Sequence, residues 1–479
     1  MTDPNETNII YQPLQALAYE GASTRFLEQQ RDLLSGTHDQ LAARELTFLQ
    51  MRSQHAIRNN GYAKVALNKY LTNLGALKVN WKDKKGKEHP LMQELWDEFC
   101  LDPSLDGYGT LDNIQSLWNS NKFITGNSFT RLQIRRKKNN NRIPLKLEVL
   151  QSETHDLFYF GEGSNKQIKY GIEFFDTKPL NYFFRLGLFQ EYWFDIQNNY
   201  KTISIPADEI LHQFDREAPG QWLGIPSLSP VLISLYELDD LTNATIAKQK
   251  AAQAISWIIK NSNPQAQLPV GTPIYAKDEK GERKVELRAN GTTVQYLNKF
   301  EDIAFNQGTD IGNNLITMLG YELRRIANAV DVPYVQLTGD LSGVDFSSLR
   351  ALFIELRNRI EYIHHFNTIP LGLSPLSFKF KRLASLYYGK KVSNAFPTYQ
   401  LPRFYGVDEL KDAQADVLEI QNGLATLQSK LDERHTTYEQ IAEDRKKIEE
   451  LGLVNLLQPP KTSTQQGNNV NPNPNSTGI

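Results

Sequence analysis

The feature that most constrains this chain is one long stretch, from Pro230 to Lys260, in which nothing breaks a helix. Ser229 is a good N-cap for it, and Pro230 suits the first helical position because the N–H missing there has no helical partner anyway. The next breaking sequence begins at Asn261. At 1.5 Å per residue this helix would be about 45 Å long, and a helix of that length needs neighbours to pack on.

Small side chains in this helix indicate how it packs. Ala247, Ala251 and Ala254 recur at helical spacing, so we expect a second helix to approach closely there. The helix contains no obvious catalytic group. Its predicted role is therefore structural.

A strand and a sharp turn precede the helix. Ile210, His212 and Phe214 alternate within residues 203–214, which is the pattern of a half-buried strand. Prolines and glycines then punctuate residues 219–226, a density that neither a helix nor a central strand tolerates.

Length and composition indicate a folded protein with two or more packed regions. The chain has 479 residues, beyond the size at which one hydrophobic core usually stops growing, and 40% of them are hydrophobic. A formal net charge of −2 gives no sign of a nucleic-acid binder held by bulk positive charge. Cys100 is the only cysteine, which excludes an internal disulfide framework and fits a reducing, intracellular origin. Residues 1–12 lack the architecture of a signal peptide, and no apolar run is long enough to span a membrane.

The first half of the chain mixes helices and strands. We expect an arm or short helices over residues 1–36, and helices over 38–77 with a break at 58–61. Strands are expected at 128–134 and 145–150, joined as a hairpin. The loop of this hairpin holds five basic residues: Arg135, Arg136, Lys137, Lys138 and Arg142. Such a loop is able to contact nucleic acid or an acidic partner, but we interpret it as a solvated loop tip.

The second half places long helices around a region of different character. Residues 262–300, punctuated by Pro and Gly, predict a small α/β or β insertion. Helical patterning returns over 302–330, residues 332–344 have the composition of a flexible loop, and a further helix should run from Asp345 or Ser347 to Pro370. Charged amphipathic helices are expected over 407–423 and 424–451. Residues 458–479 have almost no apolar content and are expected to be disordered.

A search for catalytic chemistry finds little. No P-loop, zinc-ligand spacing, nucleophile elbow or dinucleotide-binding glycine pattern occurs. His364 and His365 are adjacent on a predicted helix and diverge by about 100 degrees, which argues against a shared metal ion. His212 near Asp215 is interpreted as a hydrogen-bonded core histidine rather than an acid–base pair. We therefore predict no enzyme activity, no cofactor and no metal site.

The loop residues 338–340, Thr-Gly-Asp, are interpreted as a mobile segment rather than a cation or phosphate site. The order helix, insertion, helix predicts a stalk with a knob at its end, because the chain must go out and come back. Such an elongated subunit has side surface to bury, and side-by-side association into a closed ring would bury it.

Several ordered motifs point to one family. The strongest are PGQWLGIP at 219–226 and VPYVQLTGDL at 332–341, with SSLR at 347–350. Further pieces are RNNG at 58–61, Trp96 with 106–107, YGIE at 170–173 and IPADEILH at 205–212. From about Arg52 to Leu453 the chain thus resembles the portal proteins of tailed bacteriophages, in the lambda-type family. It departs from the usual pattern at Asn127, where an acidic residue is common, at Gly75 and at Leu223.

The resemblance implies an α+β portal fold with named parts. The expected order is an N-terminal arm (1–36), an α/β wing (37–226), a stem helix (227–261), a small clip insertion (262–300), a second stem helix (301–331), a tunnel loop (332–344), its supporting helix (345–369), a return to the wing (370–403), a helical crown (404–457) and a disordered tail (458–479). In this scheme Ala247, Ala251 and Ala254 pack neighbouring stem helices. The clip would dock partners through its basic residues, Lys277, Lys280, Arg283 and Lys284.

The same resemblance implies function and partners. The family forms a homo-oligomeric ring, typically of twelve subunits, at the portal vertex of the capsid, through which DNA is packaged, retained and ejected. Expected partners are the terminase motor, the head–tail adaptor and the major capsid protein, with synthesis in the host cytoplasm and no membrane. Residues assigned to the DNA-facing tunnel loop are Gln336, Leu337, Thr338, Gly339, Asp340, Leu341 and Ser342. The segment from Asp331 to Leu349 contains no Lys or Arg, so double-stranded DNA would be contacted weakly and without sequence preference.

Two alternatives remain from the residues themselves. Another head–tail connector or adaptor ring should be shorter and lack the order helix, insertion, helix. A metal-dependent nuclease needs clustered carboxylates, and Asp239–Asp240 lies in the long helix, where a solvated or interface face is the better interpretation.

Overall fold

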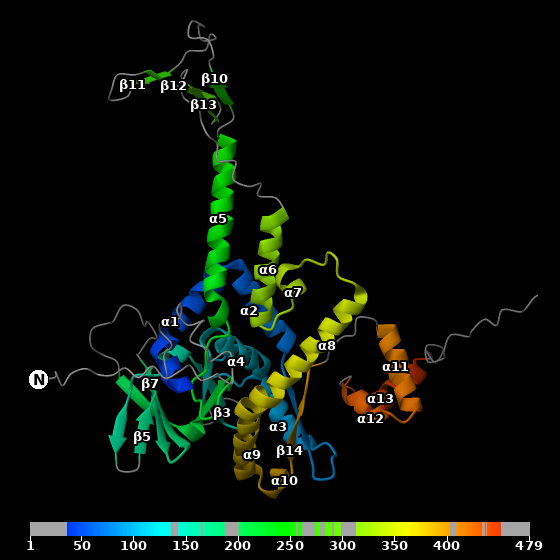
Figure 1. Ribbon diagram of the computed structural model, residues 1–479. Coiled ribbons are helices and arrows are strands. Elements are labelled where there is room, and N and C mark those ends of the chain that lie inside the picture. Colours follow the sequence, from blue (N-terminus) through cyan, green and yellow to red (C-terminus); the bar gives the residue numbers. More distant parts are fainter. Residues whose placement is uncertain are drawn as a thin grey trace, which may run out of the picture. The chain divides into compact units, whose positions relative to one another are not determined.

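The computed structural model of the protein contains two compact units, residues 1–399 and residues 400–479. It is a mixed helical and sheet protein, which confirms the predicted α+β class (Figure 1). The structure describes residues 36–135, 142–163, 166–186, 201–254, 257–260, 274–277, 283–289, 292–297, 313–402, 409–433, 436 and 438–451. The predicted tail, and the predicted arm apart from Gly36, lie outside these residues.

Two helices open the first unit, α1 (His38–Asn59) and α2 (Gly61–Leu74). Thr37 begins α1 with a capping box that includes Gln40. The predicted break at 58–61 is confirmed, because Asn60 ends one helix and caps the next: its Oδ1 accepts the Ala63 N–H at 2.9 Å. Its side-chain amide also donates to Asp239 at 2.8 Å, so the break is tied to the long helix.

An aromatic core joins distant parts of this unit. It lies among β1 (Lys78–Lys82), α3 (Pro90–Leu101) and α9 (Ser374–Tyr388), where Trp81, Trp96 and Phe380 are fully buried. The rings of Trp96 and Phe380 meet edge to face with centroids 4.9 Å apart. After the short α10 (Lys390–Ser393), β14 (Phe396–Gln400) pairs with β1, so the chain beyond residue 370 returns to the N-terminal region.

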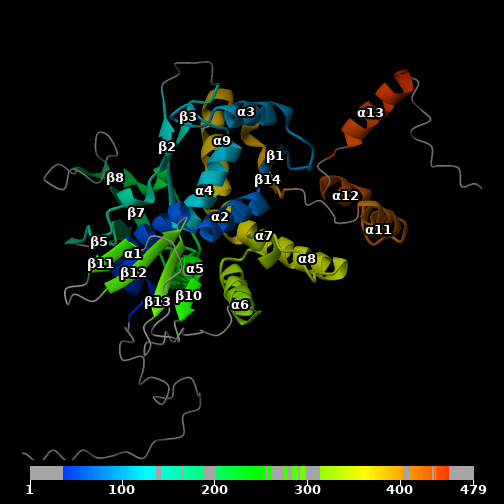
Figure 2. The same cartoon turned by 90° about the horizontal axis from the view of Figure 1, so that it is seen from above.

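A three-stranded sheet packs against α4 (Leu111–Thr125) (Figure 2). Its order is β3 (Leu145–Leu150), β2 (Asn127–Ile134), β9 (Ile210–Phe214), with neighbours antiparallel. The predicted hairpin is therefore confirmed as β2 and β3. At the described end of its loop, Arg142 pairs with Glu94 and Glu98 of α3 rather than standing free in solvent.

A five-stranded antiparallel meander follows in the chain. It contains β4 (Gly161–Gly163), β5 (Lys166–Lys169), β6 (Ile172–Phe175), β7 (Lys178–Leu186) and β8 (Lys201–Pro206), after a 3₁₀ turn at Ser152–Thr154. The predicted strand over 203–214 is wrong as a single element: a 3₁₀ turn at Ala207–Glu209 splits it into β8 and β9, which belong to different sheets. Phe129, Phe184 and Ile205 pack in the core shared by the two sheets, which explains why β9 is buried rather than half-buried.

The long helix is shorter than its sequence predicts. After a 3₁₀ turn at Ser229–Val231, α5 spans Leu232–Ala254, about 35 Å at 1.5 Å per residue. Residues 257–260, predicted to be helical, instead form β10 (Trp257–Lys260). This strand pairs in parallel with β13 (Thr292–Leu297). An aromatic and two β-branched side chains favour a pleated strand once a partner is available, so pairing overrides the helical pattern.

The inserted region is a four-stranded sheet with the order β10, β13, β12 (Arg283–Ala289), β11 (Ile274–Lys277). Helix α6 (Asn313–Ala329) then runs beside α5 (Figure 1). The predicted start of this helix near Asp302 lies outside the described residues. Two further helices follow, α7 (Tyr334–Thr338) and α8 (Phe346–Ile363).

The predicted helix stop at Pro370 is also wrong. Helix α8 continues into a π-helix, His364–Leu373, which contains Pro370, and then into α9. A proline breaks an α-helix by removing a donor and crowding the preceding turn, whereas the wider π turn has room for it. The π segment therefore lets the chain change direction without leaving the helix.

The second unit is helical and charged. The two predicted helices are three, α11 (Glu409–Gln421), α12 (Leu427–Glu433) and α13 (Tyr438–Glu450). Lys430 joins the first two through Asp416 at 2.9 Å and Glu419 at 2.7 Å. Among the described residues of both units, no helix combines the length and the apolar content needed to cross a membrane.

Candidate functional site

The turn at 219–226 is held by hydrogen bonds with the side chains of Asp39 and Gln221. The buried Asp39 carboxylate accepts the backbone N–H groups of Trp222 at 2.9 Å and Leu223 at 3.1 Å. Gln221 spans the turn, since its side-chain amide donates to the Leu223 carbonyl at 2.8 Å and its oxygen accepts from Glu217 and Ala218. The turn is thus anchored to α1 before the chain enters α5.

Two glycines bring this turn against β2. A Cβ built on Gly224 would lie 2.0 Å from the carbonyl oxygen of Gly126, so only glycine fits there. Asn127 holds the contact from the side: its Oδ1 accepts the Gly224 N–H at 2.9 Å, and its Nδ2 donates to the Gly224 carbonyl at 3.1 Å. An amide supplies both the donor and the acceptor that this reciprocal pair requires.

His212 is the core histidine that its strand pattern predicts. Its Nε2 lies 3.1 Å from Asn127 Oδ1 and its Nδ1 3.4 Å from the Tyr182 hydroxyl. Burial holds the pKa of His212 well below its usual range, so the ring is neutral at pH 7. Asp215, the partner weighed for an acid–base pair, instead accepts a hydrogen bond from Asn367 at 2.5 Å.

A buried lysine joins the π-helix to α4 and to the end of β9. Lys122 of α4 donates to Asn367 Oδ1 at 3.0 Å and lies 3.9 Å from the Asp215 carboxylate. Burial lowers its pKa against the opposing effect of Asp215. Asn367 in turn donates to the Phe214 carbonyl at 2.8 Å. One amide therefore connects α4, the end of β9 and the helix that follows α8.

The two adjacent histidines diverge as predicted. His364 is fully buried with its Nε2 3.0 Å from the Leu74 carbonyl oxygen, whereas His365 is exposed. Within the described part of the chain, no cluster of three or more His, Cys, Asp or Glu side chains has the arrangement to hold a metal ion.

The helix pair α5 and α6 has a buried end and an exposed end. Leu232, Leu235 and Leu238 near the start of α5 are buried, whereas Ala247 further along is exposed in this single chain. Ala251 and Ala254 lie on the same helix, in its last turn and a half. Residues 246–250 of α5 thus lack the cover that the start of the helix has.

Three of the four basic residues assigned to the inserted sheet lie on the paired strands β11 and β12. Lys277 of β11 is opposite Arg283 of β12, and Lys284 is opposite Ala276. Lys280 lies outside the described residues. The strand register therefore gathers the three described residues at the same end of the β11–β12 pair.

The segment 332–344 is only partly a loop, which corrects its prediction as a flexible segment. Residues 334–338 form α7, because Gln336 and Leu337 have partners that composition does not reveal: Gln336 accepts a hydrogen bond from Asn73 at 2.7 Å, and Leu337 is 3% exposed. Gly339 ends the helix in the left-handed conformation, with φ of 73°. The exposed tip is therefore residues 339–343.

The tip itself is a small local turn. Asp340 Oδ1 accepts the Ser342 N–H at 2.9 Å and its hydroxyl at 2.6 Å, and these bonds lower the pKa of the Asp340 carboxyl. Leu341 is 63% exposed. At the base, Asp331 is 2.6 Å from the Arg359 guanidinium of α8, and Arg324 lies over the Tyr334 ring. The segment is therefore held at its base by contacts with α6 and α8, while residues 339–343 are exposed to solvent.

Sequence reasoning missed Asp39, Asn73, Lys122 and Asn367. Their partners are far away in sequence, so no local pattern reveals them. Lys122 alone gives a signal, because it falls four residues after Trp118 on the buried face of α4, where a solvated lysine is not expected.

Comparison with known proteins identifies the chain's relatives. A family model described as phage portal protein, lambda family, matches residues 27–364. No curated protein matches the chain. Solved structures that resemble it include the neck of an empty gene transfer agent particle and the virion of a native particle, each with a TM-score of 0.41 at 16% identity, covering 80% of this chain and 90% of that one. The neck of a native particle computed with C12 symmetry gives a TM-score of 0.41 at 15% identity with the same coverage. Because the family match spans most of the chain, this protein belongs to the lambda family of phage portal proteins.

Proposed function

We propose that this portal protein assembles into a closed ring of twelve copies at the portal vertex of the capsid, and that double-stranded DNA passes through it during packaging and ejection. The observation that carries the proposal is the pair of adjacent helices, α5 and α6, bracketing an inserted sheet within a portal-family chain. Side-by-side packing of such subunits buries their flanks. In such a ring, one face of each subunit points toward the centre and forms part of the channel wall.

The flanks of the helices have the surface that a ring interface needs. Large apolar side chains are exposed on them: Ile246 of α5, Ile316 and Tyr321 of α6, and Ile354 of α8. Burying one such side chain contributes about 1.5–3 kcal/mol. A ring contact is heterologous, and we expect each interface to bury more than about 2,000 Å².

The parts of the family architecture map onto the described elements. Residues 37–226 and 370–403 would form the wing, α5 and α6 the stem, and the tip 339–343 with α7 the tunnel loop, supported by α8. The clip would begin at Trp257 rather than at Ser262, because β10 pairs with β13 of the inserted sheet. The helices α11 to α13 would form the crown.

Charge supports a weak contact with DNA at the tunnel loop. The segment from Asp331 to Leu349 has no Lys or Arg, and its exposed tip carries Asp340. Each phosphate neutralised by a basic residue adds salt-dependent affinity, which would slow a polymer that must move both ways. The tip therefore surrounds the DNA without binding its phosphates tightly.

The basic end of the β11–β12 pair is proposed as the docking surface for the terminase motor and later for the head–tail adaptor. Lys277, Arg283 and Lys284 would attract an acidic partner surface. The major capsid protein would contact the outer part of the ring. Motor binding that survives reversal of these charges to Glu would contradict this assignment.

No observation favours a nuclease. The portal family is a structural, non-enzymatic one, and we infer the same for this chain. Asp239, one of the two adjacent carboxylates in α5, accepts the Asn60 side-chain amide at 2.8 Å and so has a structural partner. A DNA cleavage assay with Mg²⁺ tests this: no cleavage is expected, and activity lost on Asp239→Asn would contradict it.

A further inference from the structure

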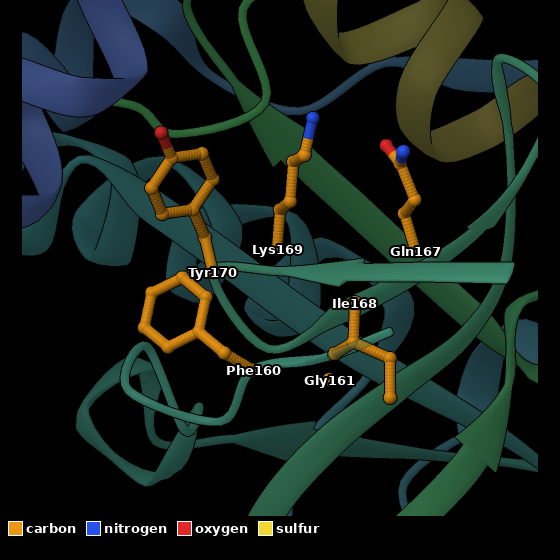
Figure 3. A pocket seen from close by; sticks show the side chains of 6 residues that line it. All are labelled: Phe160, Gly161, Gln167, Ile168, Lys169 and Tyr170. Carbon is orange, nitrogen blue, oxygen red and sulfur yellow. The ribbon is translucent and has the colours of Figure 1, made fainter. Parts of the chain in front are cut away.

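An aromatic hollow lies at the outer strands of the five-stranded sheet. It has a volume of about 430 Å³ and is lined by Phe160, Gly161, Gln167, Ile168, Lys169 and Tyr170 (Figure 3). The rings of Phe160 and Tyr170 meet edge to face at 6.0 Å, and Phe160 is 56% exposed. An exposed aromatic at the mouth of a hollow marks a surface that gains from being covered.

The backbone fixes one wall of this hollow. Tyr170 has a φ of 54°, which is rare for a bulky side chain. The next residue, Gly171, has a φ of 72°, and a Cβ there would lie 2.3 Å from the Asp156 carbonyl oxygen. Such strained conformations persist where the surroundings over-determine them. The Tyr170 ring is thus held in place before any partner arrives.

The chain enters helix α1 at the rim of the same hollow. The Tyr170 hydroxyl is hydrogen-bonded to the side chain of Thr37, the N-cap of α1. Tyr170 also packs on the cluster that contains Ala42 and Leu157. The described chain therefore begins, at Gly36 and Thr37, beside Tyr170 of the hollow. Three residues reach at most about 10 Å, which brings Leu33 and Leu34 within range of its lining.

The residues that precede α1 have the chemistry to fill it. Phe26, Leu27, Leu33 and Leu34 are apolar, and residues 1–35 contain five acidic but only two basic side chains. Lys169 is exposed at the rim of the hollow. We propose that residues 26–34 of the same chain dock in the hollow, with Leu33 and Leu34 against Phe160 and Ile168. The docked segment latches the start of α1 to the sheet.

Disulfide trapping tests this in the full-length, assembled protein. Leu34→Cys and Phe160→Cys are combined with Cys100→Ser, which removes the native thiol. The expected result is a cross-link within one chain, seen as a monomer in denaturing electrophoresis without reductant and as a linked peptide pair by mass spectrometry. The matched control pairs Leu34→Cys with Lys391→Cys, which is exposed on α10. A linked dimer would show that a neighbouring copy supplies the segment and would overturn the proposal.

A second measurement does not depend on introduced thiols. Removing residues 1–35 should raise amide hydrogen exchange in 166–170 by about tenfold, since β5 is held by the edge strand β4, which opens more easily once the docked segment no longer covers it. Phe160→Asp should raise it similarly in the intact chain, and exchange in α9 should stay unchanged as the internal control. Unchanged exchange at 166–170 in both variants, with no cross-link above the control, would mean that the hollow does not hold this segment.

Discussion

Two irregular segments of this protein, the turn at 219–226 and the segment 332–344, have similar compositions but opposite environments. Both contain proline and glycine and carry strong family motifs. The turn is sealed: Asp39, Asn127 and Gln221 satisfy its backbone, and its Gly224 touches Gly126. The segment 332–344 is anchored at its base and open at its tip. Proline and glycine therefore identify irregular backbone. Whether that backbone is rigid depends on the hydrogen bonds and packing that other parts of the chain supply.

This difference fits the two proposed roles. A turn between the wing and the stem must hold its direction under load, whereas a loop that faces moving DNA must yield. Matched substitutions in the two segments separate these roles.

Gly224→Ala should be the most damaging single change. Its added methyl group would lie 2.0 Å from the Gly126 carbonyl oxygen, so the turn must move away from β2. We expect a loss of more than about 4 kcal/mol in the free energy of unfolding, measured by denaturant titration. Gly339→Ala is the matched control: no atom lies within 4 Å of its Cβ, so it should cost only about 1–2 kcal/mol for the left-handed backbone. Equal losses in the two variants would break the comparison.

Acid should destabilise the folded protein through its two buried histidines, His155 and His212. Burial lowers the pKa of His155 from 6.5 to about 4 and holds that of His212 well below its usual range. Because the unfolded chain binds these protons near pH 6.5 and the folded chain does not, stability is complete above that pH and falls as pH drops toward 4. Each histidine contributes about 1.4 kcal/mol per pH unit in this window.

The measurement is the free energy of unfolding at pH 7 and pH 5 for the natural chain and for His155→Gln. Between pH 7 and pH 5 the variant should lose about 2 kcal/mol less than the natural chain, whatever its stability at pH 7, because His155 contributes only below about pH 6.5. An equal loss in the two chains would show that His155 is not buried in its neutral form.

Asp39→Ala should cost about 2–3 kcal/mol, since two buried backbone N–H groups lose a charged acceptor. Its counterpart in the other segment, Asp340→Ala, should change stability by less than about 0.5 kcal/mol, because the carboxylate is exposed and bonds only within its own turn. The midpoint of denaturant unfolding is measured for each variant and compared with that of the natural chain. A destabilising Asp340→Ala would mean that the tip is structural.

Leu341→Lys should have the smallest effect on folding and a clear effect on DNA. The side chain is 63% exposed, so stability should change by less than about 0.5 kcal/mol. An added positive charge at the tip should slow DNA movement during packaging, and the slowing should fade with added salt. Leu341→Gln is the neutral control. Packaging rates that are equal for the two variants at low salt would argue against a DNA-facing tip.

The sequence predicts the helices and the hairpin well, because their signals are local. The break at 58–61, the β2–β3 hairpin and the core position of His212 all follow from caps, alternation and turn residues. The failures occur where distant partners decide. Residues 257–260 pair with β13, α7 forms because Asn73 and the protein core hold Gln336 and Leu337, and Pro370 lies within a π-helix that Lys122 and His364 help to anchor.

The candidate site divides in the same way. The motif at 219–226 marks the correct segment, but Asp39 and Asn127, which fix it, are far away in sequence. Residues 336–342 were predicted as one loop, yet the structure separates a packed part from an exposed tip. The composition of a segment indicates which backbone conformations it is able to adopt. The conformation that it does adopt is selected by contacts with residues that are distant in the sequence.

The most direct test of the account is the state of assembly. The mass of the assembly is measured by native mass spectrometry on purified full-length protein at micromolar concentration. Its end-on shape is determined by electron microscopy. The account predicts a closed ring of twelve copies with a central channel, which Ala247→Glu on the exposed half of α5 should weaken without unfolding the subunit. Monomers only, or open filaments without a channel, would contradict it.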